Sequence, residues 1–424
     1  MANNQNIFYK KKILIYGLGK SGLSASKFLK KNNQVITYDD KRKNGIKKIK
    51  ADKFDYIIIS PGIDINKCSL SKFLKSNTKK IYTDLDVFYN HYEKNNKITI
   101  TGTNGKSTTA QILYEILKNQ KIDARLVGNI GNPILLEKNV KINTVFVIEA
   151  SSYQLDYSKI FRTNVAAIIN ISADHLERHK TLKQYIKAKF RLIKSQTKKD
   201  YAILNVNNFY IKKQVRNQNF LPKIIKVSKQ VNSSFLKKIN NPYFMTEGNK
   251  ENLLFVIAIS KIFKIKDKIL LKILNNFIGL QYRQQIIFKS KNLTIINDSK
   301  ATTFSSSVSI LKSISNVYWV VGGLAKQGDK FLMSKTNNRN VKAYIFGKNK
   351  SFFVKKLRNK MRFETFINLK FLVKKIFLDI KNDKNQKHKT ILFSPAAASF
   401  DSFKNFEERG KYFNNLIKKA FNVR

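Results

Sequence analysis

The nine residues TGTNGKSTT, 101–109, decide the fold of this 424-residue chain. They follow the strand-like run ITI (98–100) and precede the helix-like run AQILYEILKN (110–119). A glycine-rich loop between a strand and a helix lets backbone N–H groups approach a phosphate, and the helix dipole favours the bound anion. The stretch departs from the usual phosphate loop, because Ile100 stands where the first glycine is expected and Gly102 comes two residues later.

The residue types in this loop predict an ATP site with Mg²⁺ as a second cofactor. The glycines allow close backbone approach, Lys106 can reach the β- and γ-phosphates, and the Ser107 hydroxyl can hold the metal ion. A Gly-Lys-Ser turn that arose by chance is the alternative, and the order strand, loop, helix disfavours it. The predicted ATP-binding residues are Gly102, Thr103, Asn104, Gly105, Lys106, Ser107 and Thr108.

A second glycine-rich motif lies near the N-terminus. The strand-like run KILIY (12–16) leads into GLGKSG (17–22), and the next strand-like run ends in Asp39 and Asp40. Three glycines at this spacing, followed by an acid about 20 residues on, form the dinucleotide-binding fingerprint. The motif therefore predicts a Rossmann-like domain, and an NAD-dependent oxidoreductase using Gly17, Gly19, Gly22 and Asp39 is one interpretation of it.

Strand-like and helix-like runs alternate along the whole chain, which predicts an α/β fold with largely parallel sheets. We expect three domains: an N-terminal Rossmann-like domain (1–92), a central P-loop ATPase-type domain (93–280) and a C-terminal Rossmann-like domain (281–424). The polar stretch HYEKNNK (91–97) is interpreted as the first linker.

The composition excludes several classes of protein. No apolar run approaches the ~18 residues that a membrane-spanning helix needs, and the polar N-terminus is unlike a signal peptide. A single cysteine, Cys68, excludes an intrachain disulfide and fits a reducing cytoplasm. The net charge of +55 suggests nucleic-acid or anionic-membrane binding, but the lysines are spread over the chain with abundant Asn, Ile and Phe. We interpret the charge as compositional drift and expect no nucleic-acid partner.

The chain resembles the Mur ligase family, and within it the branch that adds D-glutamate. TGTNGKST resembles the family's ATP loop, which has the shorter glycine spacing. IEASSYQLD (148–156), NISADHLERH (170–179), NDSKATT (297–303) and SPAAASFDSFKNFEERG (394–410) resemble further family motifs. The likeness runs from about residue 12 to residue 413.

The resemblance implies ATP-dependent amide formation through an acyl phosphate. The expected substrates are UDP-N-acetylmuramoyl-L-alanine and D-glutamate, in the cytoplasmic stage of peptidoglycan precursor synthesis, and the enzyme is expected to be a monomer. The implied Mg²⁺ ligands are Ser107, Glu149, His175 and Lys189, with Lys189 carbamylated so that a cation becomes an anionic ligand. His179 has no counterpart in the family and is interpreted as a surface residue. The implied catalytic residues are Lys106, His175, Lys189 and Lys300.

Further contacts follow from the same resemblance. The nucleotide would also meet Asn249, Asn252, Arg283 and Asp298, although Gly248 replaces the usual histidine and the Pro-His before Arg283 is missing. D-Glutamate would be held in the last domain, and the UDP-sugar substrate mainly in the first. The implied substrate-binding residues are Lys20, Ser21, Asp39, Asp40, Ser60, Pro61, Gly62, Gly128, Asn129, Ser151, Gln154, Thr302, Lys326, Ser399, Phe400 and Phe406.

Three alternatives remain at this point. An NAD-dependent oxidoreductase would explain the first motif and leave the phosphate loop unexplained. A basic nucleic-acid binder would bind with an affinity that falls steeply with salt. A Mur ligase that adds a different amino acid is the nearest alternative, and the NDSKAT and SFDSFKNF segments argue against it.

Overall fold

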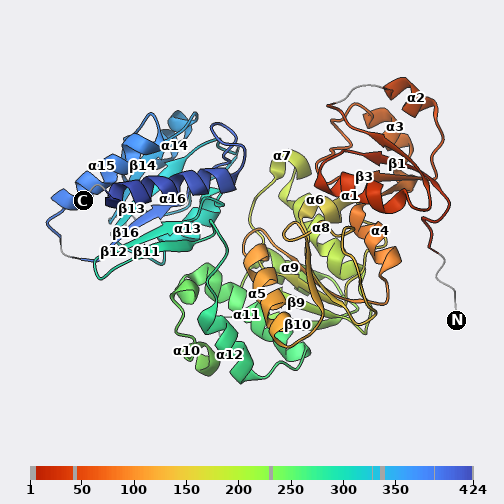
Figure 1. Ribbon diagram of the computed structural model, residues 1–424, viewed down its shortest axis with the longest axis horizontal. Helices are drawn as coiled ribbons and strands as arrows, with labels where there is room; N and C mark the ends of the chain where they lie inside the picture. The colour runs from red at the N-terminus through yellow and green to blue at the C-terminus, as the bar shows by residue number, and fades with distance from the viewer. Residues whose placement is uncertain are drawn as a thin grey trace. The chain divides into compact units, whose positions relative to one another are not determined.

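The computed structural model describes residues 6–41, 45–228, 233–326, 328–334, 340–385 and 387–422. Its strands form three separate sheets that follow one another along the chain (Figure 1). The chain divides into two compact units, of which the first holds the N-terminal and central sheets and the second holds the C-terminal sheet. Three successive sheets confirm the predicted α/β fold class, while the predicted domain boundaries stay a prediction.

The N-terminal sheet has four parallel strands in the order β2-β1-β3-β4. Helices α1 and α4 pack on one face with Ile13 and Ile15, and α2 and α3 pack on the other with Leu14 and Tyr16. The run KILIY forms the centre because a parallel strand covered on both faces is apolar throughout. The elements are β1 Lys12–Tyr16, α1 Lys20–Leu29, β2 Gln34–Tyr38, α2 Ile46–Ala51, β3 Tyr56–Ile59, α3 Ser71–Ser76, η1 Thr78–Lys80, β4 Ile81–Tyr82 and α4 Asp84–His91.

The central sheet has six parallel strands in the order β10-β9-β8-β5-β7-β6. Strand β5 lies between β7 and β8, so the three loops that leave their carboxyl ends meet at one edge, where open α/β sheets bind ligands. The elements are β5 Asn96–Thr101, α5 Lys106–Asn119, β6 Ala124–Gly128, β7 Val145–Glu149, α6 Ser152–Tyr157, β8 Val165–Ile168, α7 Leu176–His179, α8 Leu182–Lys194, β9 Tyr201–Asn205, α9 Phe209–Asn217 and β10 Lys223–Val227.

The predicted linker at 91–97 is wrong at its C-terminal end. Strand β5 begins at Asn96, and Lys97 is buried with its ammonium group on the carbonyls of Glu93 (2.8 Å) and Asn95 (2.5 Å). The long lysine side chain looked solvated in the sequence, but backbone carbonyls satisfy its charge inside the fold. On the N-terminal side of this strand, the Phe88 and Phe146 rings lie 4.8 Å apart, so α4 and the central sheet share one core.

A helical segment follows β10 and leads into the C-terminal sheet. It contains α10 Ser233–Lys237, η2 Pro242–Met245, α11 Glu247–Ile262 and α12 Asp267–Asn276. The apolar run LLFVIAI (253–259) lies within α11.

The C-terminal sheet has six strands in the order β11-β12-β16-β13-β14-β15, with only β11 antiparallel to its neighbour. Helices α13 and α14 share a core with Trp319 on one face, and α15 and α16 share one with Tyr344 on the other (Figure 1). The elements are β11 Gln285–Lys289, β12 Leu293–Asn297, α13 Phe304–Leu311, β13 Val317–Gly322, β14 Val341–Phe346, α14 Lys350–Leu357, β15 Arg362–Thr365, α15 Leu369–Asn382, β16 Lys389–Phe393 and α16 Phe406–Asn422.

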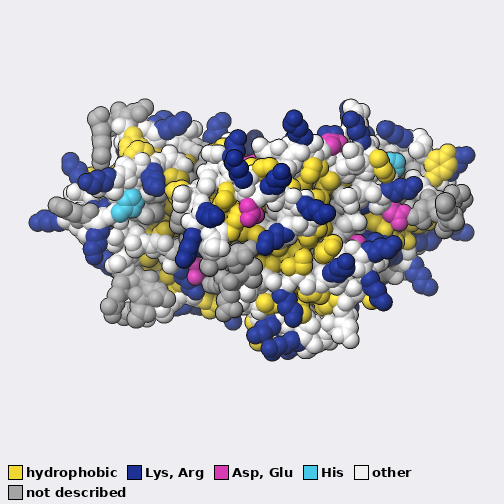
Figure 2. Space-filling model, turned by 90° about the horizontal axis from the view of Figure 1, so that it is seen from below, with side chains coloured by type: hydrophobic (Ala, Val, Ile, Leu, Met, Phe, Trp, Pro, Cys, Tyr) yellow, Lys and Arg dark blue, Asp and Glu magenta, His cyan; other side chains and the backbone are white. Residues whose placement is uncertain are grey.

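Among the helices that the structure describes, none has the length and apolar character that crossing a bilayer requires. On the face drawn in Figure 2, Lys and Arg side chains are distributed among neutral and hydrophobic ones rather than gathered in one place. This distribution agrees with the spread of lysines along the sequence.

Candidate active site

The phosphate loop links the end of β5 to the start of α5. Gly102 and Gly105 have φ angles of 156° and 83°, and Gly105 is the N-cap of the helix. Positive φ is strained for residues with a Cβ, which explains glycine at both positions. The Asn170 side chain and carbonyl accept the N–H groups of Asn104 and Thr103, each at 2.9 Å. The loop is thus held in place by Asn170, which follows the neighbouring strand β8.

Two ammonium groups meet at the carbonyl oxygen of Gly102. Lys106 Nζ donates to Gly102 O at 3.0 Å and to Thr103 O at 2.9 Å. Lys189 Nζ, from α8, donates to Gly102 O at 2.8 Å and lies 4.7 Å from the centre of the Tyr185 ring. Lys189 is only 1% exposed, so its charge is little screened by water. The loop therefore carries a concentrated positive field next to a helix N-terminus, which suits an anion of high charge.

A buried carboxylate lies beside the first turn of α5. Glu149 ends strand β7, is 1% exposed and accepts a hydrogen bond from Ser107 Oγ at 2.5 Å. Its other oxygen accepts from Asn129 Nδ2 at 2.8 Å. Gly128 has φ 105°, and a Cβ there would lie 2.4 Å from the Glu149 carbonyl oxygen. The structure thus brings together four of the residues that the sequence proposed separately: Ser107, Gly128, Asn129 and Glu149.

This arrangement fits a magnesium ion in its chemistry. Mg²⁺ prefers oxygen ligands and commonly binds through one or two carboxylates, waters and substrate phosphates. The Glu149 carboxylate and the Ser107 hydroxyl are such donors at one point. Within the described residues there is no group of three or more His, Cys, Asp or Glu that could hold a metal ion alone.

The loop after β8 carries the two histidines of the SADHLERH motif. His175 has φ 55° and precedes α7, and its Nδ1 lies 2.8 Å from the Tyr153 hydroxyl. The prediction that His179 is a surface residue is wrong, because it is 3% exposed with Nε2 3.0 Å from Ser152 Oγ. Burial lowers the pKa of His179 to about 4, and the nearby His175 and Arg178 act in the same direction. His179 is therefore neutral at pH 7.

The start of α6 holds the two predicted residues Ser151 and Gln154 in a capping box. Ser151 Oγ accepts the Gln154 N–H at 3.2 Å, and the Gln154 side chain in return accepts the Ser151 N–H at 3.1 Å. Gln154 also reaches the fully buried Asp84 at 3.5 Å. Burial raises the pKa of Asp84 to about 6, although hydrogen bonds from Ser21 and Gln154 oppose the shift.

The glycine-rich loop of the N-terminal sheet is hydrogen-bonded to the carboxylate of Asp39. Asp39 accepts the Leu18 N–H at 2.6 Å and the Lys41 N–H at 3.0 Å. Ser60, 8% exposed, donates to the Gly17 carbonyl at 2.5 Å. Asp40 accepts from the Tyr16 hydroxyl at 2.6 Å. Hydrogen bonds from nearby residues of the chain thus hold both carboxylates, Asp39 and Asp40, in place.

The remaining predicted residues of this sheet lie around the same loop. Gly22 packs so tightly that a Cβ would lie 1.8 Å from the Gly17 carbonyl oxygen, which accounts for the third glycine of the fingerprint. Lys20 and Gly62 are exposed, while Ser21 and Pro61 are half-buried. The loop therefore presents both polar side chains and backbone to solvent.

In the second unit, Asp298 directly follows strand β12 and is almost completely buried. It accepts from Ser394 Oγ at 3.0 Å and from the Gln284 N–H at 3.1 Å. Burial raises its pKa to about 7, against the effect of those hydrogen bonds. Asn249 is bonded to Gln284 Oε1 at 3.1 Å and to Asn252 Nδ2 at 3.2 Å. These residues form one connected polar cluster.

Two other predicted residues of this unit, Lys300 and Arg283, lie near Phe406 at the start of α16. Lys300 Nζ lies 4.1 Å from the centre of the Phe406 ring, and Arg283 lies 5.9 Å from it. Lys326 forms an ion pair with Asp174 at 2.7 Å. Ser399 is buried, Thr302 is half-buried and Phe400 is 71% exposed. The structure thus brings Lys300, Arg283 and Phe406 together.

Several residues at these sites were not identified from the sequence. Asn170 and Tyr185 shape the phosphate loop, Tyr153 bonds His175, and Arg409 is completely buried next to the NDSKAT loop. Asn170 stands just past the end of β8, and its strand-end position was the signal that could have identified it. Tyr185 and Arg409 gave no such signal, because each lies inside a helix.

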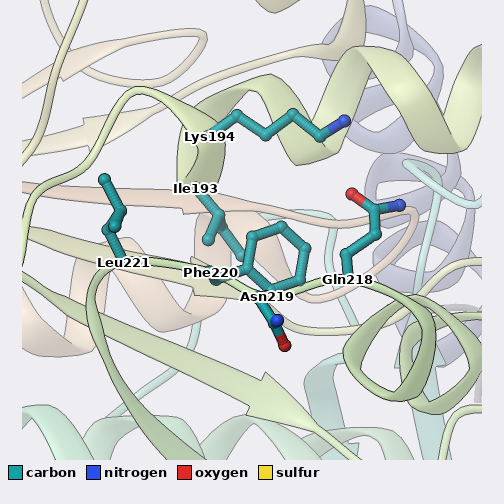
Figure 3. A pocket seen from close by; sticks show the side chains of 6 residues that line it. All are labelled: Ile193, Lys194, Gln218, Asn219, Phe220 and Leu221. Carbon is teal, nitrogen blue, oxygen red and sulfur yellow. The ribbon is translucent and has the colours of Figure 1, made fainter.

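A separate groove of about 380 Å³ lies at the end of α8 (Figure 3). None of the predicted site residues lines it, and its lining contains no carboxylate or imidazole for acid–base chemistry. The lining residues are Ile193, Lys194, Gln218, Asn219, Phe220 and Leu221.

Comparison with known proteins points in one direction. Residues 100–273 match the family described as "Mur ligase middle domain". A UDP-N-acetylmuramoylalanine–D-glutamate ligase from Rickettsia felis is 33% identical, with the match covering 98% of each chain. A protein of the same name from Francisella tularensis subsp. novicida is 32% identical, with 96% of this chain and 95% of that one covered.

Solved structures agree in fold. The MurF ligase of Thermotoga maritima in complex with ADP gives a TM-score of 0.58 at 16% identity, with 99% of this chain and 98% of that one covered. The UDP-N-acetylmuramate–alanine ligase of the same organism gives 0.56 at 16% identity, with 98% and 100% covered. At such identities the likeness bears on the fold alone.

Proposed function

The chain belongs to the Mur ligase family, and we propose that the sites described above carry out the reaction after which its curated relatives are named. It is an ATP-dependent ligase that joins D-glutamate to UDP-N-acetylmuramoyl-L-alanine in peptidoglycan synthesis. The cytoplasm as its location and a monomeric state are part of the proposal.

The observation that carries the proposal is the position of the Lys106 ammonium group on the phosphate loop, beside the Ser107–Glu149 pair. Activation of a carboxylate by ATP brings two anions together, and the barrier falls when fixed positive charge stabilises them. We assign Gly102 to Thr108 to the triphosphate, with Lys106 on its terminal phosphates. Ser107 and Glu149 would hold Mg²⁺, which supplies further positive charge when bound.

His175 and Lys189 are proposed as the further metal ligands, with Lys189 as its carbamate. The amine of Lys189 is buried against the Gly102 carbonyl, and a neutral amine formed at such a place could react with CO₂. Incorporation of ¹³C-bicarbonate, read by ¹³C NMR as a carbamate signal that Lys189→Met removes, tests this assignment. Absence of the signal would leave Lys189 as an ammonium group that stabilises the loop.

The remaining proposed roles concern the binding of the UDP-sugar substrate, of ATP and of D-glutamate. The UDP-sugar substrate is assigned to the N-terminal loop and to Gly128, Asn129, Ser151 and Gln154. ATP is assigned in addition to Asn249, Asn252, Arg283 and Asp298. D-Glutamate is assigned to Thr302, Lys326, Ser399, Phe400 and Phe406, since a dicarboxylate needs a cation and hydrogen-bond donors. Lys300 is assigned to the reaction centre as a catalytic residue.

The decisive experiment measures phosphate release from ATP with UDP-N-acetylmuramoyl-L-alanine and each of three acceptors. We expect release with D-glutamate and little with L-glutamate or L-alanine. Release with L-alanine instead would favour a Mur ligase of different specificity. A change in nicotinamide absorbance without phosphate release would favour the oxidoreductase interpretation of the first motif.

A further inference from the structure

Arg409 is a buried cation with no role in the assignments above. It lies in the first turns of α16 and is 0% exposed. Its Nη2 donates to the carbonyl of Ser299 at 2.6 Å and to that of Ala397 at 2.9 Å. Its Nε donates to Ser299 Oγ at 3.1 Å. One guanidinium group therefore connects α16 to two loops, of which one lies 110 residues and the other 12 residues earlier in the sequence.

Both loops carry residues assigned to D-glutamate. Ser299 directly precedes Lys300 and lies three residues before Thr302. Ala397 lies two residues before Ser399. The spacing between Thr302 and Ser399 depends on where Ser299 and Ala397 are held, and Arg409 bonds both.

The third loop of the region also touches this guanidinium. A Cβ on Gly323, whose φ is 128°, would lie 3.1 Å from Arg409 Nη1 and 2.7 Å from the Ala398 carbonyl oxygen. Leu324 and Ala398 exchange two backbone hydrogen bonds of 2.9 Å, which tie the loop leading to Lys326 to the loop leading to Ser399. Glycine at position 323 thus gives the guanidinium room between the two loops.

The same helix turn fixes the neighbouring contacts. Ser299 Oγ donates to the Phe406 carbonyl at 2.8 Å, and Asn297 Nδ2 donates to the Gly410 carbonyl at 2.9 Å. Phe406 in turn presents its ring to Lys300. The first turn of α16 is thus hydrogen-bonded to both Asn297 and Ser299 of the NDSKAT loop, and Arg409 of the same turn adds its own bonds to Ser299.

The chemistry of this position requires an arginine. Burying a charge is costly unless it is fully hydrogen-bonded. A planar guanidinium offers several donors in a fixed fork, while an ammonium group is a compact point charge. Within the described residues Arg409 Nη1 has no hydrogen-bond partner, so the side chain is retained at a cost. Burial lowers the pKa of Arg409 to about 10, which still leaves it protonated at neutral pH.

We infer that Arg409 is a positioning residue for the amino-acid acceptor. It holds the loops of Lys300, Thr302 and Ser399 at the spacing that D-glutamate requires, without touching the substrate itself. The inference rests on the proposed function, because it takes D-glutamate as the acceptor bound between these loops.

The nucleotide contacts should be spared when Arg409 is altered. Asp298 is held by Ser394 Oγ at 3.0 Å, by the Gln284 N–H at 3.1 Å and by its own N–H on the Phe393 carbonyl at 2.7 Å. None of these bonds involves Arg409. A change at Arg409 should therefore separate binding of the acceptor from binding of ATP.

The test compares Arg409→Lys with the unaltered enzyme in steady-state kinetics. Lysine keeps the charge and loses the fork, so at least one of the two loops loses its bond. We expect KM for D-glutamate to rise about ten- to a hundredfold, as for the loss of a hydrogen bond to a charged group. KM for ATP and for the UDP-sugar substrate should stay within about twofold, which is smaller than the loss of one hydrogen bond.

Two further variants guard against a general loss of folding. Leu372→Ala removes buried apolar contacts from α15 in the same unit and should lower Tm while leaving KM for D-glutamate unchanged. Ser299→Ala keeps the guanidinium and removes the hydroxyl between Arg409 and Phe406, so it should raise the same KM by a smaller factor. If Arg409→Lys does not fold, Ser299→Ala decides the question.

Each outcome is decisive. If the unaltered enzyme does not use D-glutamate, the proposed function fails before Arg409 is tested. If the enzyme is active and the variants raise all three KM values equally, or lower only kcat, Arg409 is structural and the inference is overturned. A rise confined to KM for D-glutamate supports the inference.

Discussion

The two glycine-rich loops of the first unit have the same local plan and opposite electrostatic surroundings. Both follow a buried parallel strand, turn on glycines with positive φ and open a helix. The loop at Gly17 is closed by the Asp39 carboxylate. The loop at Gly102 is contacted by the ammonium groups of Lys106 and Lys189.

This difference shows that a glycine pattern determines backbone shape and leaves the ligand open. Backbone N–H groups at a helix N-terminus favour any anion. The field is then set by side chains from other segments, such as α8 for the central loop and the end of β2 for the N-terminal loop. At the N-terminal loop the Asp39 carboxylate accepts backbone N–H groups of its own loop, while at the central loop the Lys106 ammonium group favours a triphosphate.

The largest effect expected from this comparison is that of Lys106→Ala. The substitution removes the ammonium group assigned to the terminal phosphates, and we expect ATP-dependent phosphate release to fall about 10²–10³-fold, as for the loss of one preorganised donor. Lys20→Ala is the matched control, because it removes the same charge from the start of α1 in the other loop. An exposed cation contributes little, so the control should change only KM for the UDP-sugar substrate, by up to about fivefold. Equal losses in both variants would contradict the assignment of ATP to the central loop.

The next effect concerns the metal ion. Glu149→Gln keeps the shape of the side chain but removes the charge that accepts from Ser107 and Asn129. We expect the Mg²⁺ concentration for half-maximal activity to rise at least about tenfold, a range typical for altered metal sites. A titration of Mg²⁺ at saturating ATP measures this concentration, and circular dichroism checks that the variant is folded. An unchanged Mg²⁺ requirement would show that Glu149 only positions Ser107.

The same comparison shows what the sequence could predict. The apolar runs KILIY and VFVIE identified the buried strands because both faces of a parallel sheet are covered. The strands β6, β10, β11 and β15 were not identified, since their runs mix charged and apolar residues, as in RFET (362–365). The course of the backbone, including both glycine-rich loops, could be predicted from local sequence patterns.

Contacts between distant segments could not be read in the same way. His179 looked like a surface residue, yet it bonds Ser152 inside the fold. Arg409 was not singled out in the sequence, yet it is completely buried and its partner Ser299 lies 110 residues away. A single sequence gives the chemistry of each side chain but not its partner, and burial is decided by the partner.

A smaller effect is expected in the N-terminal loop. Asp39→Asn replaces one carboxylate oxygen by an amide N–H, so either Leu18 or Lys41 loses its acceptor. We expect KM for the UDP-sugar substrate to rise about three- to tenfold, as for one lost hydrogen bond, with KM for ATP unchanged. Steady-state kinetics with each substrate varied in turn measures both values. A rise in KM for ATP would mean that the two loops do not bind separate ligands.

The smallest effect concerns the buried Asp84, which accepts from Ser21 at the start of α1 and from Gln154. Burial raises its pKa to about 6 in the folded state, above the ordinary value of 3.8. Between these two pH values the folded state binds more protons than the unfolded state, so this group's contribution to stability falls as pH rises. From pH 5 to pH 7 the loss amounts to about 1 kcal/mol.

Asp84→Asn removes this titration and keeps an oxygen acceptor for Ser21 or Gln154. The free energy of unfolding of the variant, relative to the unaltered protein, should therefore rise by about 1 kcal/mol between pH 5 and pH 7. Urea unfolding at both pH values measures this difference, and the comparison cancels other groups such as His179 that titrate in the same range. A difference that is independent of pH would mean that Asp84 is ionised throughout. The acid beneath the N-terminal loop would then add a permanent negative charge there, and the contrast with the central loop would be sharper.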